Sequence, residues 1–231
     1  MLILSEVWRT YQTGEIKTHA LRGVDLEVKE GEFLVILGPS GSGKSTMLNI
    51  MGGLDHPTQG TVSVGSRVLS DMKDTELTRF RREVSGFVFQ EFNLLPTLNA
   101  YENVEIGARL TDSPYSVDDA LRMVGLEGFE ARFPHELSGG EQQRVSIARA
   151  IVKGPKLLFA DEITGSLDET TAKGVLKTVK TLCKTLGTTV VMITHNTSIA
   201  AIADRVVRLN SGRIESVHEN ESPVEVDAVH F

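Results

Sequence analysis

The feature that most constrains this chain is the glycine-rich stretch Gly38–Ser45, which reads GPSGSGKS. It follows Phe33–Leu37, a short apolar run that predicts a buried strand, and a helical pattern begins near Gly43. Its spacing fits G-x-x-x-x-G-K-[ST], in which the glycines let backbone N–H groups turn inward around phosphate oxygens. The sequence therefore predicts a strand, a phosphate loop and a helix in succession.

Several residues of this loop have an expected contact with a nucleoside triphosphate. We expect Lys44 to reach the β- and γ-phosphates and Ser45 to place its hydroxyl on Mg²⁺, while the start of the helix adds a partial positive charge. A glycine-rich structural turn is the alternative, but the flanking strand and helix favour the phosphate loop. The expected ATP-binding residues here are Gly38, Ser40, Gly41, Ser42, Gly43, Lys44, Ser45 and Thr46.

Composition restricts the classes of protein to which the chain can belong. Its 231 residues suffice for one substantial domain, and 40% hydrophobic with 24% charged residues is typical of a globular protein. With 24 Lys and Arg against 31 Asp and Glu, the net charge of -7 argues against a nucleic-acid binder. The single cysteine, Cys183, excludes an intrachain disulfide.

The apolar runs are too short to span a membrane, which takes roughly 20 residues. Phe33–Leu37 and Val190–Ile193 are instead typical of buried strands. The first residues lack the basic and long apolar segments of a signal peptide. We therefore expect a soluble chain that associates with a membrane only through a partner.

Strand and helix patterns alternate along most of the chain. Strands are expected at 2–11, 17–37, 60–64, 68–69, 85–89, 157–160, 188–193, 205–209 and 213–217. Helices are expected from about 43 to 52, at 74–82, between 99 and 125, at 139–153 and 169–186, and from about 197. The alternation predicts an α/β fold with a mainly parallel sheet covered by helices.

Two segments depart from this alternation. Residues 91–150 are mostly helical, so we interpret them as an inserted helical subdomain. The tail from His218 to Phe231 carries scattered acids and one proline, and we expect it to be poorly ordered.

Two acidic residues end the apolar stretch Leu157–Ala160. Ligands of α/β sheets bind at the carboxyl ends of the strands, so Asp161 is expected to hold Mg²⁺. Glu162, one residue further, is placed to polarise a water for attack on the γ-phosphate. An exposed acid pair that caps the helix from Glu169 onward is the alternative, which the phosphate loop makes less favoured.

A second candidate anion site lies at Leu137–Arg144, which reads LSGGEQQR just before a helical pattern. Ser138 can cap that helix, and the two glycines after it leave backbone N–H groups free for an anion. A structural cap followed by a glycine turn is the alternative.

The stretch LSGGEQQR resembles the signature of ATP-binding-cassette (ABC) proteins. With the phosphate loop, LLFADE and Ile193-Thr194-His195, the resemblance covers nearly the whole chain in the order of that family. It implies a P-loop NTPase fold: an α/β mainly parallel sheet with an N-terminal antiparallel β subdomain and an inserted α-helical subdomain. It also implies two cassettes packed head to tail, in which the signature of one contacts the γ-phosphate held by the other. The implied residues in trans are Ser138, Gly139, Gly140 and Glu141.

The implied domain is single and spans residues 1–231. Residues 1–90 and 151–217 would form the RecA-like core with the antiparallel β subdomain, 91–150 the helical subdomain with the signature, and 218–231 a tail.

Further residues match family positions individually. Tyr11 is similar to the aromatic residue that stacks on adenine, with Trp8 as a rival and core packing as an alternative. Gln90 is similar to the glutamine that senses Mg²⁺ and the attacking water, or is a plain polar loop residue. Asp168 resembles an aspartate that crosses the dimer interface, or caps a helix. His195 resembles the histidine that contacts the γ-phosphate, with a structural histidine as the alternative.

Segments such as Phe92–Pro96 and Glu102–Val104 resemble the LolD/MacB-type branch, whose cassettes serve exporters and mechanical transducers of the cell envelope. One departure lies beside the chemistry: Ile163 stands where the family usually has proline. Proline fixes φ and removes an N–H donor, so we expect altered loop rigidity with the chemistry of Glu162 retained.

The resemblance implies an ATPase, with ATP and Mg²⁺, that dimerises around ATP as a homodimer and drives a membrane permease or envelope complex. The permease would dock near Gln90–Tyr101, and the chain would lie in the cytoplasm on the inner face of the membrane. One alternative is a regulatory module of a non-transport envelope complex. The other is a soluble ABC ATPase acting on DNA or ribosomes, although the chain lacks the long coiled coil or second cassette of such proteins.

Overall fold

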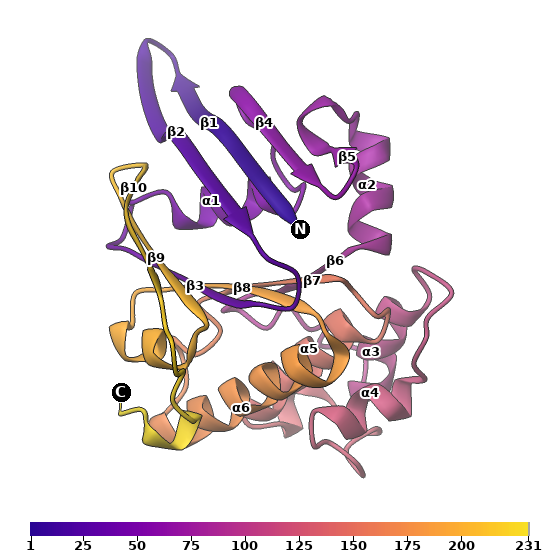
Figure 1. The fold of residues 1–231 in the computed structure, drawn as a ribbon. Helices are drawn as coiled ribbons and strands as arrows, with labels where there is room; N and C mark the ends of the chain where they lie inside the picture. Colours follow the sequence, from indigo (N-terminus) through magenta and orange to yellow (C-terminus); the bar gives the residue numbers. More distant parts are fainter. Residues whose placement is uncertain (231) are drawn as a thin grey trace.

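Two β-sheets organise the computed structural model, which describes residues 1–230 (Figure 1). One is antiparallel, in the order β2 (Ile16–Val28), β1 (Leu2–Thr13), β4 (Gln59–Val64) and β5 (Arg67–Val68). The other is in the order β10 (Arg213–Glu219), β9 (Arg205–Asn210), β3 (Phe33–Leu37), β8 (Thr189–Thr194), β7 (Leu157–Asp161) and β6 (Ser85–Val88). In this second sheet the strands from β9 to β6 run parallel, and β10 pairs antiparallel with β9. The predicted α/β class with an antiparallel subdomain is confirmed.

The parallel sheet divides the interior into two cores. Because side chains alternate across a strand, Leu34 and Ile36 face one core, whereas Phe33, Val35 and Leu37 face the other. The first core holds α1 (Lys44–Met51) between the two sheets, as Figure 1 shows. Since both faces are covered at the centre of the sheet, β3, β7 and β8 are almost continuously buried.

The second core lies under the helices on the other face of the parallel sheet. They are α3 (Ala100–Ala108), α4 (Val117–Met123), α5 (Gly139–Ile151) and α6 (Glu169–Leu186). Each begins after a residue whose side chain accepts a backbone N–H of the first turn: Asn99, Ser116, Ser138 and Asp168. Together with α2 (Asp74–Glu83), which follows β5, these helices lie where the sequence predicts them.

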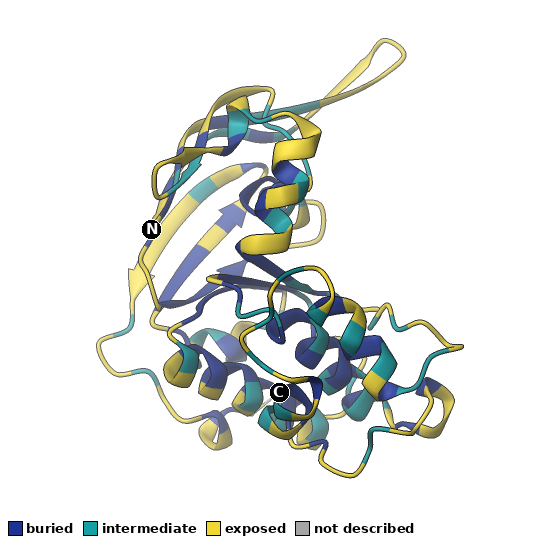
Figure 2. Ribbon diagram, turned by 90° about the vertical axis from the view of Figure 1, so that its right-hand side faces the viewer, coloured by how far each residue is buried: buried dark blue, intermediate teal, exposed yellow. Residues whose placement is uncertain are grey.

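The hairpin of β1 and β2 is longer than its apolar pattern suggests. The pairing continues to Thr13 and Ile16, where most side chains are exposed. Figure 2 shows this end of the hairpin as an exposed projection from the molecule. None of the helices formed by residues 1–230 is both long and apolar enough to cross a membrane.

The prediction of a poorly ordered tail is wrong for the residues that the structure describes. Strand β10 continues to Glu219, and the short 3₁₀ turn η4 (Val226–Ala228) packs against α6, with Val226 buried. On α6, Lys180 donates a hydrogen bond to the backbone of Val224 (2.7 Å). The composition of residues 218–230 resembles that of a disordered tail, but their apolar residues Val226 and Val229 are buried in the second core. Phe231 lies outside the described residues.

Candidate functional site

The phosphate loop connects β3 to α1 and packs closely against two other strands. Gly43 has φ 102°, and a Cβ there would lie 2.4 Å from the carbonyl oxygen of Ala20 in β2. A Cβ on Gly38 would lie 2.2 Å from the carbonyl oxygen of Leu209 in β9. Both positions therefore require glycine, and the loop is held at the carboxyl edge of the parallel sheet.

Lys44 is almost fully buried in this loop, at 6% exposure. Its Nζ donates to the carbonyl oxygens of Gly38 (2.9 Å) and Pro39 (3.0 Å), and within residues 1–230 no carboxylate pairs with it. The buried Ser42 hydroxyl has no hydrogen-bond partner among the described residues. A buried cation that donates to two carbonyl oxygens and, within residues 1–230, forms no ion pair, beside an unpaired hydroxyl, fits an anionic ligand. Ser40, Gly41 and Ser45 are exposed at this loop, and Thr46 is half-buried.

Asp161 ends β7 beside this loop and accepts a hydrogen bond from the Ser45 side chain. Partial burial raises the pKa of its carboxyl, while the Ser45 contact lowers it and the charge of Glu162 raises it. Residues 1–230 contain no cluster of three His, Cys, Asp or Glu side chains able to hold a metal. A hydroxyl and a carboxylate fit Mg²⁺ in the manner usual for this ion, which takes its other ligands from water and substrate phosphates.

Glu162 and His195 are brought together across neighbouring strands β7 and β8. The His195 Nδ1 and the Glu162 Oε2 lie 2.9 Å apart, and the Glu162 N–H donates to the carbonyl of Ile193 (3.0 Å). Glu162 has φ 47°, a left-handed conformation that is rare for a residue with a side chain. Ile163, next to it, points into the second core and is 2% exposed, so an apolar contact anchors the loop at this place.

Gln90 follows β6 and approaches the loop after Glu162. A Cβ on Gly165 would lie 3.1 Å from the Gln90 Nε2, so the two segments are in close contact. Asp161, Glu162, His195 and Gln90 thus follow three adjacent strands. The structure gathers these predicted residues at one sheet edge.

Ser138 and Glu141 form a reciprocal cap at the start of α5. The Ser138 hydroxyl and the Ser138 N–H both donate to the Glu141 Oε2 at 2.7 Å. This hydroxyl contact, with the N–H, holds the pKa of Glu141 below its usual value. A Cβ on Gly140 would lie 2.1 Å from the Thr171 Cγ2, so this helix start packs tightly on α6. Among residues 1–230, no hydrogen bond or ion pair joins 138–141 to the phosphate loop.

Asp168 caps α6 and accepts the Thr171 N–H at 3.1 Å. The Thr171 side chain, followed by this N–H, lowers the pKa of the Asp168 carboxyl. Asp168 therefore has the helix-capping role that the sequence offered as an alternative. A role across an interface is compatible with it because Asp168 is exposed.

Tyr11 and Trp8 differ in their surroundings. The Tyr11 ring is 40% exposed and its hydroxyl donates to Asp55 (2.9 Å). The Trp8 ring is half-buried, with His19 edge-on to it and Arg213 over its face. Tyr11 is the more accessible ring.

Three buried or half-buried polar residues that were not among the predicted site residues hold residues 89–99, around Gln90. Asn103 is fully buried and donates to the carbonyls of Leu95, Leu98 and Asn99 while accepting the Leu95 N–H at 2.8 Å. From α5, Arg149 donates to the carbonyls of Phe92 and Asn93, and Gln143 donates to that of Phe89. In the sequence, the signal that could have indicated such a residue is a polar side chain on the apolar side of a helical pattern.

A strand, phosphate loop and helix, with two acids at the end of a strand two places away in the same sheet, define a P-loop nucleoside-triphosphate hydrolase. The family model of ABC transporters matches residues 21–165. The chain belongs to this family and is an ATP-binding cassette, an ABC ATPase.

Relatives place the chain within the family. A Mycoplasma genitalium protein, provisionally named as ABC transporter ATP-binding protein MG065, is 46% identical over 96% of this chain and 48% of its own length. The chain thus spans about half the length of the first curated relatives that it matches. The macrolide export ATP-binding/permease protein MacB of Bdellovibrio bacteriovorus is 39% identical over 94% of this chain and 34% of its own length.

A solved structure shares the fold closely. It is a dimeric, post-hydrolysis state of the ATP-binding cassette MJ0796, bound to ADP and Pi, a protein of Methanocaldococcus jannaschii. It superposes with a TM-score of 0.87 at 42% identity and covers 96% of this chain and 100% of its own. The predicted antiparallel β subdomain and mainly parallel sheet are shared with it.

Proposed function

We propose that two copies of this chain pack head to tail around ATP and hydrolyse it with Mg²⁺. The observation that carries the proposal is the separation of two sites suited to anions: the phosphate loop around Lys44 and the capped start of α5 at Ser138. They share no hydrogen bond within the described chain, which supports a nucleotide that bridges two copies. The dimeric form of the related cassette, bound to ADP and Pi, supports the same arrangement.

The chemistry is assigned to the residues at the sheet edge. Lys44 neutralises charge on the β- and γ-phosphates, while Ser45, Asp161 and Gln90 hold the Mg²⁺, which supplies charge neutralisation when bound. Glu162 Oε accepts the proton of the attacking water, and His195, which already contacts Glu162 at 2.9 Å, orients that carboxylate and reaches the γ-phosphate. Signature residues 138–141 and Asp168 complete the site from the partner copy.

A groove beside this site supports a membrane-permease partner. It has a volume of about 750 Å³ and is lined by residues of the segment after Gln90 together with Pro134, Gly139, Gln142 and Ser166. Leu95 and Tyr101 are exposed apolar residues nearby. We assign the groove to a permease helix, and residues 91–150 to a helical subdomain that carries its motion to the signature. The chain would then lie at the inner face of a membrane.

Within this assignment the LolD/MacB-type branch is favoured, because two of the relatives are named as MacB macrolide export proteins. The net charge of -7 disfavours the alternative of a DNA- or ribosome-directed ATPase.

The test is co-purification of the chain with a membrane protein expressed from the same gene neighbourhood. The complex, reconstituted in lipid vesicles, is expected to hydrolyse ATP and move a substrate. Leu95→Asp, at an exposed position beside the groove, is expected to abolish co-purification, whereas Arg109→Asp, at the exposed end of α3, leaves it intact. ATP hydrolysis without transport, at normal complex formation, would instead support a regulatory module of a non-transport complex.

A further inference from the structure

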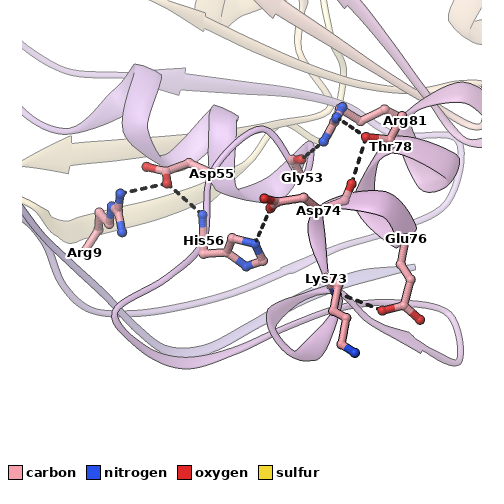
Figure 3. A network of polar contacts seen from close by, with 9 residues as sticks. All are labelled: Arg9, Gly53, Asp55, His56, Lys73, Asp74, Glu76, Thr78 and Arg81. Atoms are coloured by element: carbon pink, nitrogen blue, oxygen red, sulfur yellow. Dashed lines mark hydrogen bonds and ion pairs between the residues drawn. The ribbon is translucent and has the colours of Figure 1, made fainter.

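Asp55 lies in the loop after α1 and gathers three groups around one carboxylate. It accepts the Tyr11 hydroxyl (2.9 Å) and the His56 N–H (2.8 Å), and it pairs with Arg9 (2.8 Å). Figure 3 shows the contacts of Asp55 with Arg9 and His56, and the onward contact of His56 with Asp74. The side chains of Arg9 and Asp55 are only 23% and 24% exposed, so this pair is shielded from water more than a surface ion pair.

The same network holds the ring of Tyr11 at two places. Its hydroxyl is tied to Asp55, and the Arg9 guanidinium lies over the ring face, 4.5 Å from the ring centre. Because Asp55 binds both Arg9 and Tyr11, one carboxylate fixes the guanidinium and the ring together. An aromatic ring near an exposed hairpin end is therefore held in one orientation.

The position of Tyr11 relative to the phosphate loop follows from the pairing of the strands. Tyr11 pairs with Thr18 in β2, and two residues further along β2, Ala20 touches Gly43 of the phosphate loop. Two residues of a strand span about 7 Å. Tyr11 and the phosphate loop thus meet neighbouring positions of β2, and this proximity suits a nucleotide whose phosphates lie at the loop and whose base lies at the ring.

We propose that Asp55 and Arg9 are positioning residues that hold Tyr11 as a preformed stacking surface for the nucleotide base. The inference rests on the proposed ATP binding, with Tyr11 as the base platform, and it adds what fixes that platform. A ring that is ordered before the nucleotide arrives loses less conformational entropy on binding. This gain is uniform between the bound substrate and the transition state, so it acts on affinity and leaves kcat unchanged.

The experiment measures the Kd of ATP, the Kd of inorganic tripolyphosphate, and kcat for Asp55→Ala, Tyr11→Ala and the double variant. We expect Asp55→Ala to raise the Kd of ATP about 3- to 10-fold. The Kd of tripolyphosphate, which has no base, and kcat stay at wild-type values. Adding Asp55→Ala to Tyr11→Ala is expected to change nothing further, since Asp55 acts through the ring. Asp55→Asn, which keeps an acceptor for the Tyr11 hydroxyl, restores part of the affinity.

The matched control is Asp74→Asn, which alters an exposed carboxylate in the same network. Among residues 1–230, the hydrogen bond of this carboxylate is with His56, at 3.4 Å. This variant is expected to leave every constant unchanged. If Tyr11→Ala leaves the Kd of ATP at its wild-type value, the base platform itself is wrong. Two outcomes would leave Tyr11 as the base platform but overturn its positioning by Asp55. In the first, Tyr11→Ala weakens ATP binding and Asp55→Ala does not. In the second, Asp55→Ala raises the Kd of ATP as much in the Tyr11→Ala background as in wild type.

Discussion

Glu162 occupies a backbone conformation that only a well-anchored residue adopts. Glu162 follows the buried strand β7 and has a φ of 47°. Its N–H donates to the Ile193 carbonyl in β8, and the next side chain, Ile163, is buried. The loop is therefore anchored by an apolar contact at the place where the sequence lacks proline. The carboxylate itself stays half-buried beside His195, free to face a water.

Replacing Glu162 by Gln keeps the shape of the side chain and removes its basicity. We expect the variant to bind ATP, to accumulate as a dimer with it, and to lose about 10²- to 10⁴-fold in kcat. Phosphate release and size-exclusion chromatography with ATP measure the two effects. Asp118→Asn, at the exposed start of α4, is the charge-matched control and keeps its activity. Near-normal turnover of Glu162→Gln would remove the general-base assignment.

At the residue scale, motif-bearing positions could be predicted because local sequence determines them. The glycines of the phosphate loop and the acids after β7 must stand at fixed offsets from a strand. The surroundings of Tyr11 could not be predicted, because Asp55 lies 44 positions away in a loop and only the tertiary fold joins them.

Lys153, just after α5, connects this helix to α2. Its Nζ donates to the carbonyl of Arg81 at 2.7 Å, and burial lowers its pKa from 10.5 to about 8. The unfolded chain keeps the ordinary pKa, so between about pH 8 and 10.5 it binds more protons than the folded chain. The free energy of unfolding contributed by Lys153 therefore rises with pH, by up to about 3 kcal/mol.

The measurement is urea unfolding of wild type and Lys153→Met at pH 7.5 and pH 10. Subtracting the free energy of unfolding of the variant from that of wild type removes the titration of the groups they share. This difference in free energy is expected to grow toward pH 10. Lys156→Met, at an exposed position, is the matched control for the loss of a lysine. If the difference in free energy of unfolding between wild type and Lys153→Met does not change with pH, a lowered pKa of Lys153 is contradicted.

Asn103 determines the course of the chain between Gln90 and α3. Replacement of this fully buried side chain by Ala leaves the Leu98 carbonyl and the Leu95 N–H without their hydrogen-bond partner, whereas the Leu95 and Asn99 carbonyls keep only a backbone N–H donor. We expect the free energy of unfolding to fall by about 2–5 kcal/mol. Hydrogen exchange in residues 94–99 should accelerate. Arg109→Ala, which removes only an exposed ion pair with Glu105, should change stability by less than about 0.5 kcal/mol. Equal effects of the two changes would refute the assignment.

At the element scale, helix starts were predictable wherever a capping side chain precedes an apolar pattern, as at Ser138 and Asp168. The position of the tail was not predictable, because Val226 is buried in a core that elements far away in the sequence create. The hairpin of β1 and β2 also extends beyond its apolar pattern, since strand pairing can continue where both faces are exposed.

In the whole molecule, the phosphate loop lies at the carboxyl edge of the parallel sheet, and the signature lies at the start of α5. Within residues 1–230 no hydrogen bond or ion pair joins the two, so one chain alone does not bring them together. The second core joins the parallel sheet to α3, α4, α5 and α6, so a shift of α5 is felt by the segment after Gln90. A nucleotide held between two copies could therefore reach the groove through α5, and the groove could act back on the nucleotide.

A composite site predicts complementation between two inactive variants. Lys44→Ala disables the phosphate loop, and Ser138→Asp keeps a good helix cap while placing a negative charge against the partner's γ-phosphate. Each variant alone contains no intact pair of loop and signature and is expected to be inactive. Mixed dimers contain one intact pair, so an equimolar mixture should recover up to about a quarter of wild-type ATPase activity. Dilution below the dimer's dissociation constant should abolish the recovery. No recovery in the mixture would show that the loop and the signature act within one chain. Full activity of Ser138→Asp alone would remove Ser138 from the site.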